Sequence, residues 1–196
     1  IAGLCHDLGH GAFSHSFDHL LRDSDMKDSI CAHHEARSMR LTERLIIELN
    51  TQGLTHFTMH DIHLIQYFID SGKFAEQNPS YAPGLEQIVS NVSHKVDVDK
   101  MDYLLRDSLM LRFDSVVKSI NIRDILQRSL IVDGVWMFHA ADQGIIYDLI
   151  CRRFIFYTNY YLHPDVNAVS CMVTDAMKMV ESVYNWAHSA LLEKPE

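Results

Sequence analysis

The chain has 196 residues, and 47% of them are hydrophobic, so one sizeable hydrophobic core can form and intrinsic disorder is not expected. Its 17 basic and 26 acidic residues give a net charge of −9, which does not support binding to nucleic acid and means that any anion site is local. No apolar run reaches the roughly 18 residues that a membrane-spanning helix needs, so no membrane partner is expected. We therefore expect a single domain over 1–196.

The cysteines indicate the cellular compartment of the protein, and the first residue indicates whether its N-terminal part is present. The cysteines show neither a CxxC pair nor the compact spacing of a disulfide framework, which favours reduced thiols in an intracellular protein, cytoplasmic or nuclear. They are Cys5, Cys31, Cys151 and Cys171. The chain begins with Ile1 rather than Met, and we expect it to be N-terminally incomplete.

Helical periodicity dominates the first part of the chain. Apolar residues recur at helical spacing over 35–50, 60–69, 85–92 and 99–111, and each of these stretches is predicted to be a helix. The stretch 74–83 carries two prolines and is predicted to be a loop.

One stretch departs from this pattern. Residues 129–140 place β-branched and aromatic side chains on both sides of an Asp-Gly dipeptide, which is typical of a type I′ turn and predicts a β-hairpin. Two helices are expected after it, over 145–162 and 166–192, separated by Pro164, which suits a first-turn position. The predicted fold class is mainly α with one small β-hairpin near residues 129–140.

Histidines gather near the N-terminus. Six of the thirteen fall within the first 34 residues: His6, His10, His15, His19, His33 and His34. A single histidine is most often a hydrogen-bonded core or surface residue. However, the adjacent His6 and Asp7 can both bind one divalent cation where they sit at a helix end, and His10 would share a face with His6 in a helix.

A second cluster, over 97–107, combines carboxylates with Lys100 and Tyr103. Aspartates at a helix start are commonly solvated capping residues. The combination of possible metal carboxylates, a cation for phosphate and a tyrosine one turn from a basic residue nevertheless suits nucleotide recognition.

Three segments carry a family resemblance: IAGLCHDLGHGAFSHSFD at 1–18, HHE at 33–35 and VDVDKMDYLLRD at 96–107. They resemble the HD-domain deoxynucleoside triphosphate triphosphohydrolases of the SAM-and-HD-domain-containing type. The likeness extends more weakly through the hairpin to 173–176. It implies an HD-domain helical bundle that hydrolyses deoxynucleoside triphosphates (dNTPs) to deoxynucleoside and inorganic triphosphate, in a homo-oligomer, dimeric or tetrameric.

The resemblance also implies a divalent metal, Zn, Fe, Mn or Mg. His6 and Asp7 match the family's His-Asp metal pair, and Asp99 matches its later metal-binding aspartate. The family's first metal-binding histidine lies well upstream of the pair, so three of four expected ligands fall within the chain. Such a metal polarises a phosphate and acidifies water.

The family's catalytic residues match His10, His34, Glu35 and Asp18. An imidazole beside carboxylates suits proton transfer to the departing oxygen. We assign the general acid to His10, oriented by Glu35 and Asp18 through His34, although His34 is equally able to be the acid.

The residues that the resemblance places around the substrate are His15, Lys100, Tyr103, Asp107, Arg153 and Tyr161. Cationic side chains suit phosphates, and an aromatic ring with a carboxylate at the 3′-hydroxyl can exclude a ribose. Arg153 is equally interpretable as a salt-bridged helix residue, and the tyrosines of 157–161 as core.

Several alternatives compete with this interpretation. HDLGH at 6–10 has the spacing of a zinc-peptidase HExxH helix, but Gly9 and Gly11 weaken such a helix and Asp7 is shorter than glutamate. An HD phosphohydrolase acting on another nucleotide and a catalytically inactive fragment acting as an oligomerisation or interaction module are the others. His56, His60 and His63 are spaced for a second metal but read better as a polar face, and Met172, Met177 and Met179 as core or subunit packing.

Overall fold

The computed structural model describes residues 1–24, 30–70, 83–112 and 121–185. The chain divides into two compact units, each described here by itself. Unit 1 comprises Ile1–Gly3 and His63–Tyr160, and unit 2 comprises Leu4–Ile62 and Tyr161–Glu196. The chain passes from one unit to the other at three places, which lie within α1 (Ala2–Cys5), α4 (Met59–Asp70) and the π-helical turn Tyr157–Tyr161.

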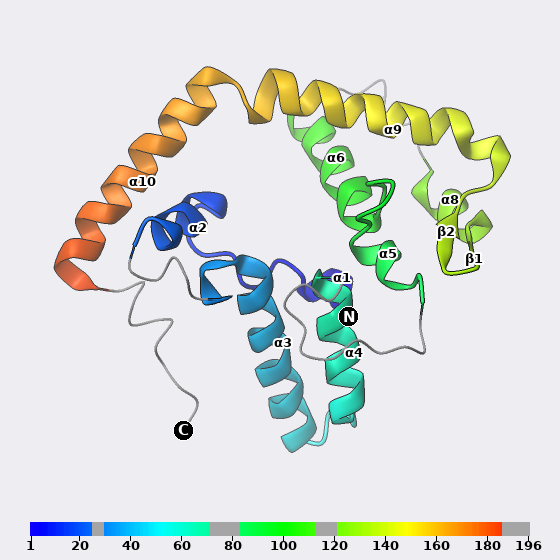
Figure 1. Cartoon of the computed structure of the whole chain (residues 1–196), viewed down its shortest axis with the longest axis horizontal. Coiled ribbons are helices and arrows are strands. Elements are labelled where there is room, and N and C mark those ends of the chain that lie inside the picture. Colours follow the sequence, from blue (N-terminus) through cyan, green and yellow to red (C-terminus); the bar gives the residue numbers. More distant parts are fainter. Residues whose placement is uncertain (25–29, 71–82, 113–120, 186–196) are drawn as a thin grey trace. The chain divides into compact units, whose positions relative to one another are not determined.

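Unit 2 is built on α2 (His15–Arg22), which packs against α10 (Pro164–Tyr184) (Figure 1). The apolar positions of α2 face one way because they recur every three or four residues, and they form a core with residues from the turn Ile30–Ala32 and from α10. This core contains Phe17, Leu20, Leu21, Ala32 and Met177. At the rim, Lys178 Nζ pairs with Asp23 Oδ2 at 2.8 Å.

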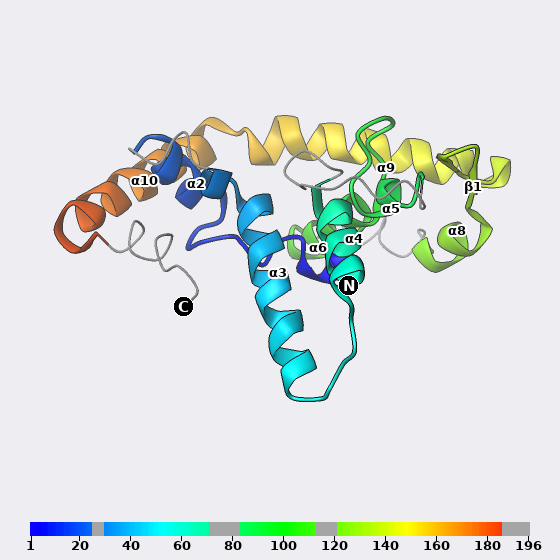
Figure 2. The same cartoon turned by 60° about the horizontal axis from the view of Figure 1, so that its bottom comes forward.

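The long helix α3 (His34–Thr51) also belongs to unit 2 and runs unbroken in Figure 2. Its N-terminal half is buried at Ala36, Arg37, Ser38, Met39 and Thr42, whereas most of its C-terminal half is exposed. Buried polar residues of α3 therefore gather near its N-terminus.

Unit 1 contains α5 (Glu86–Val89), α6 (Val98–Met110), α8 (Ile122–Arg128) and α9 (Gln143–Phe156). Asp97 caps α6, because its buried carboxylate accepts from the Lys100 backbone N–H at 2.9 Å. Helices α6 and α9 contact each other, and Arg152 Nη1 of α9 donates to Ser108 Oγ of α6 at 3.2 Å. A 3₁₀ turn at Ala140–Asp142 leads into α9.

The predicted hairpin is confirmed. Strands β1 (Leu130–Val132) and β2 (Val135–Met137) pair antiparallel with Ile131 opposite Trp136. The two turn residues have φ values of 50° and 75°, which is why Asp-Gly suits the position. Gln87 fixes the hairpin to α5, since its amide donates to Gly134 O at 2.6 Å and accepts from Trp136 N at 3.1 Å.

The helical predictions are confirmed in type, with changes at their ends. The helices predicted over 35–50, 60–69 and 99–111 correspond to α3, α4 and α6. The helix predicted over 85–92 is only α5, four residues long, and α9 ends at Phe156, six residues before the predicted boundary. Pro164 does lie in the first turn of α10. The loop predicted over 74–83, except Pro83, and residues 186–192 lie outside the described residues.

The observed fold class is mainly α with one small hairpin, as predicted. None of the four cysteines forms a disulfide bond. Of the three C-terminal methionines considered above, Met177 is buried, while Met172 and Met179 are exposed. Within the described ranges, none of the helices combines the length and apolar character that crossing a membrane demands.

Gly9 is required by a close approach of chain segments in unit 2. Its N–H donates to Ser38 Oγ at 2.8 Å, and a Cβ built on Gly9 would lie 2.7 Å from the Arg37 Cβ and closer still to the His34 carbonyl oxygen. Backbone atoms at such a separation cannot move aside cheaply. The segment 6–10 can rest on α3 only with glycine at this position.

We predict that Gly9→Ala destabilises the protein by about 2 kcal/mol, because the added methyl group forces the segment away from α3. Gly144→Ala is the matched control, since Gly144 lies in α9 with no atom within 4 Å of the added methyl group. There the same change should leave stability unchanged or raise it by up to about 1 kcal/mol, as alanine favours helix. Denaturant unfolding measures both, and equal effects would contradict the close approach.

Candidate functional site

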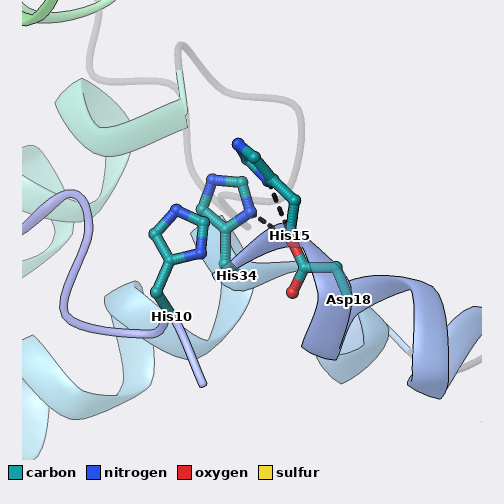
Figure 3. Close-up of side chains that lie close together, drawn as sticks. All are labelled: His10, His15, Asp18 and His34. Carbon is teal, nitrogen blue, oxygen red and sulfur yellow. Dashed lines mark hydrogen bonds and ion pairs between the residues drawn. The ribbon is translucent and has the colours of Figure 1, made fainter. Parts of the chain in front are cut away.

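Three histidines and one aspartate gather in unit 2. His10 comes from the segment after α1, His15 and Asp18 from the first turn of α2, and His34 from the first residue of α3 (Figure 3). We call His10, His15, Asp18 and His34 the imidazole cluster. Its donor atoms lie within 4.8 Å of one another and are of types that divalent metals accept.

Asp18 is the centre of the imidazole cluster. Its side chain is buried, and Oδ2 accepts a hydrogen bond from His34 Nδ1 at 2.7 Å, with His15 Nδ1 3.8 Å from the same oxygen. Its other oxygen, Oδ1, is bound by Arg37 Nη2. Burial alone would raise the pKa of Asp18, but the interactions with His15, His34 and Arg37 outweigh it and hold the pKa well below its usual range. Asp18 is therefore ionised at neutral pH.

Arg37 ties three chain segments together. It is only 8% exposed, its Nε donates to Gly9 O at 2.7 Å, and its Nη1 donates to Cys31 O at 2.7 Å. Its Cζ also lies 5.3 Å from the centre of the Phe17 ring. One guanidinium thus joins the segment before α2, the 3₁₀ turn before α3 and the first turn of α2.

The rings of His10 and His34 are stacked. Their centroids are 3.9 Å apart with an interplanar angle of 17°, and Figure 3 shows the two rings next to each other. Burial, followed by the nearby charge of His34, lowers the pKa of His10, whereas Asp18 raises the pKa of His15. His10 Nδ1 is buried without a hydrogen-bond partner among the described residues. Glu35 lies beside this pair, with Oε2 3.5 Å from His34 Nδ1.

The His-Asp pair lies directly after α1, at a helix end as the sequence analysis required. His6 Nε2 is 3.4 Å from Asp7 Oδ1. Two ligand atoms bound tetrahedrally to one ion at about 2.1 Å are also about 3.4 Å apart, so the pair fits a shared metal. Residues 6–9 form turns rather than a helix, which argues against the HExxH alternative. Asp99, the third predicted ligand, belongs to unit 1, and its part in the metal site stays a prediction.

The predicted substrate residues are divided between the units. Lys100, Tyr103 and Asp107 lie on α6 and Arg153 on α9, all in unit 1, whereas His15 and Tyr161 belong to unit 2. Arg153 hydrogen-bonds to the Tyr103 hydroxyl, and burial raises the pKa of Tyr103 to about 12. Lys100 Nζ pairs with Asp97 Oδ2 at 2.6 Å. None of the five residues of the turn Tyr157–Tyr161 is buried, so they are not core.

Sequence reasoning missed Arg37 and Ser38. Both are buried beside the imidazole cluster, and a signal was present, because Arg37 follows His34 by three residues and so lies on the same helix face. The spaced histidines His56, His60 and His63 belong to none of the potential metal groups found within the described ranges.

We predict that Asp18→Asn lowers the free energy of unfolding by about 3 kcal/mol at pH 7, because Arg37 is left buried without its counter-ion. The folded-state pKa of Asp18 lies below its unfolded value, so its stabilisation is present above about pH 4 and is lost as the pH falls. The difference in the free energy of unfolding between wild type and Asp18→Asn should therefore become smaller below pH 4. Asp23→Asn, which removes an exposed carboxylate paired with Lys178, should have a much smaller effect. Denaturant titrations between pH 3 and pH 8 check this, and a gap independent of pH would contradict it.

Known proteins resemble the chain over most of its length. No protein-family model matches it. It is 31% identical over 176 residues to the deoxynucleoside triphosphate triphosphohydrolase SAMHD1 homolog of Dictyostelium discoideum, covering 90% of this chain and 32% of that protein. It is 31% identical over 197 residues to SAMHD1 of Bos taurus, with the same coverage of 90% and 32%. An HD domain-containing protein of Acanthamoeba polyphaga mimivirus is 32% identical over 195 residues, 94% of this chain and 37% of the viral protein.

A solved structure agrees with these sequence matches. The crystal structure of a phosphohydrolase from Bacteroides thetaiotaomicron superposes with a TM-score of 0.66 and 25% identity, covering 93% of this chain and 38% of that one. The chain thus spans about a third of the length of the curated relatives it matches. Over nine tenths of its own length, the chain is similar in sequence to the deoxynucleoside triphosphate triphosphohydrolases SAMHD1.

Proposed function

We propose that the chain carries the catalytic residues of a metal-dependent HD phosphohydrolase that converts dNTPs to deoxynucleoside and inorganic triphosphate. The observation that carries this proposal is the buried Asp18 carboxylate hydrogen-bonded to His34 at 2.7 Å. The names of the relatives from Dictyostelium discoideum and Bos taurus, both dNTP triphosphohydrolases, support the substrate class.

Asp18 fixes which nitrogen of His34 can transfer a proton. Because Asp18 accepts from Nδ1, that nitrogen carries a hydrogen, and the transferable proton belongs to Nε2. An imidazolium held this way can protonate the departing 5′-oxygen of a deoxyribose. This geometry supports His34 as the general acid, one of the two assignments open from the sequence.

His10 and Glu35 have supporting roles in this proposal. His10 stacks on the His34 ring and limits its rotation. Glu35 Oε2, 3.5 Å from His34 Nδ1, places a second carboxylate beside the ring and helps to hold its orientation.

We assign the metal to His6, Asp7 and Asp99. When bound, a divalent cation there would polarise the phosphate and lower the pKa of a bound water. The 3.4 Å separation of the His6 and Asp7 ligand atoms supports the assignment for two of the three residues.

The substrate assignments follow the chemistry of the side chains. Lys100 and Arg153 suit phosphate oxygens, while Tyr103 and Asp107 suit the deoxyribose ring and its 3′-hydroxyl. His15, whose pKa is raised by Asp18, adds positive charge, and Tyr161 is assigned to the same substrate.

The decisive measurement is product analysis with the four dNTPs in the presence of Mn, Mg, Fe or Zn. We expect inorganic triphosphate and free deoxynucleoside, and a loss of about a hundredfold or more in kcat for His34→Asn. His19→Asn is the matched control, because His19 is an exposed histidine of α2 outside the imidazole cluster.

Other products would redirect the proposal. Nucleoside monophosphates, cyclic nucleotides and guanosine polyphosphates offered in parallel would reveal an HD phosphohydrolase with another substrate. Folded, metal-loaded chain that hydrolyses none of these compounds would favour the interaction-module alternative. Unchanged turnover in His34→Asn would contradict the role given to the His34–Asp18 pair.

Metal binding has its own test. We predict that Asp7→Asn and Asp99→Asn each lower the metal bound per chain at least tenfold in titrations with Zn or Mn, because each removes one charged ligand. Asp148→Asn, at an exposed carboxylate of α9, should bind as wild type does. Metal content that survives both ligand variants but falls in His15→Asn would place the ion in the imidazole cluster instead.

A further inference from the structure

A pocket in unit 1 gathers positive charge. Its walls come from the segment before α6, from α6 and from α9, and they include three cations and no carboxylate. The lining residues are Lys95, Val96, Lys100, Met101, Leu104, Leu149, Ile150 and Arg153. Because most of this lining is apolar, water is partly excluded and the attraction between these cations and an anion is strengthened.

Two of the three cations are already engaged. Lys100 Nζ lies 2.6 Å from Oδ2 of the fully buried Asp97, which offsets much of its charge. Arg153 hydrogen-bonds to Tyr103 and stacks over the Tyr157 ring at 5.1 Å, while its Nε is buried without an acceptor among the described residues. Lys100 and Arg153 are therefore both held in place by neighbouring side chains within unit 1.

Lys95 is the cation of the pocket that stays unpaired within the described part of the chain. Its side chain is exposed and forms no ion pair with any described carboxylate. Its backbone has φ 58°, the left-handed region, which glycine adopts more cheaply than lysine. Glycine would fit the backbone of this turn better than lysine does. The conformation of the turn therefore does not explain why a lysine stands at this position.

The turn around Lys95 is held on both sides. Asn91 N donates to Asp97 Oδ2 at 2.9 Å, and His94 N donates to Asn91 Oδ1 at 3.0 Å. The His94 ring also lies 3.1 Å from the Trp136 carbonyl oxygen, which fixes the turn to the hairpin. Lys95 is thus presented from a rigid turn rather than a loose loop, which lowers the entropic cost of binding.

We propose that Lys95 binds phosphate oxygens and is the third cationic contact, beside Lys100 and Arg153, for a triphosphate group that lies against the open side of this pocket. The inference rests on the proposed function for the class of anion, and it assigns a residue that neither the sequence analysis nor the family resemblance singled out. A triphosphate carries several negative charges, and Lys95 supplies positive charge that Asp97 does not offset.

The test is binding of inorganic triphosphate to the full chain, measured by calorimetry. We expect Lys95→Gly to weaken binding about tenfold, through loss of one charge-assisted contact, and to reduce the salt dependence of binding. The same change should raise the thermal midpoint slightly, because glycine relieves the left-handed backbone. Lys95→Arg should bind as wild type does, since it restores the charge.

Arg112→Gly is the matched control. Arg112 is also an exposed cation of unit 1 with φ 60°, but it does not line the pocket. Its replacement removes the same charge and the same backbone strain, so it should raise the thermal midpoint similarly and leave triphosphate affinity unchanged. Equal affinities for Lys95→Gly and Arg112→Gly, or no binding to the wild-type chain at millimolar triphosphate, would overturn the inference.

The binding role of Lys95 and the proposed hydrolysis of dNTPs can be confirmed or rejected independently. Triphosphate binding that depends on Lys95 without dNTP hydrolysis would retain the binding residue and reject the reaction. Hydrolysis of dNTPs with a KM unaffected by Lys95→Gly would retain the reaction and reject the binding residue.

Discussion

The buried ion pair between Arg37 and Asp18 holds the geometry of unit 2. Removing two charges from water costs several kcal/mol for each ion, and the cost is offset only when the remaining donors and acceptors are satisfied. Here they are: the guanidinium also donates to two backbone carbonyl oxygens, and the carboxylate also accepts from His34. The interaction therefore works only if α2, α3 and the segment at Gly9 are all in place, which makes the cluster depend on the whole unit.

This ion pair also determines what His34 can do. With Arg37 on one oxygen of Asp18, the other oxygen is left to accept from His34 Nδ1, and the ring orientation follows. The same carboxylate that anchors the fold thus leaves Nε2 as the nitrogen of His34 that the proposed reaction would use. Stability and ring orientation cannot be changed independently at Asp18.

Much of this was predictable from local pattern, and the rest was not, for physical reasons. The helices 35–50 and 99–111 and the Asp-Gly turn depend on spacing and turn chemistry, which the sequence displays directly. Arg37 was missed because an arginine on a helix is ordinarily exposed, and only tertiary packing brings Gly9 O and Cys31 O to it. The end of α9 at Phe156 was missed because apolar and aromatic residues continue through the π-helical turn, so periodicity carries no stop signal.

The two His-Asp groups of unit 2 differ in what they can hold. In the imidazole cluster, Asp18 already balances a guanidinium, and the rings of His10 and His34 are stacked on each other. A second cation there would compete with Arg37 for one carboxylate. Asp7, by contrast, has a side chain that is 55% exposed and lies within 3.5 Å of imidazole nitrogens on both sides, His6 and His10. Proton transfer therefore suits the cluster at Asp18 and metal binding suits the pair at Asp7, three residues from the histidine that links the two groups.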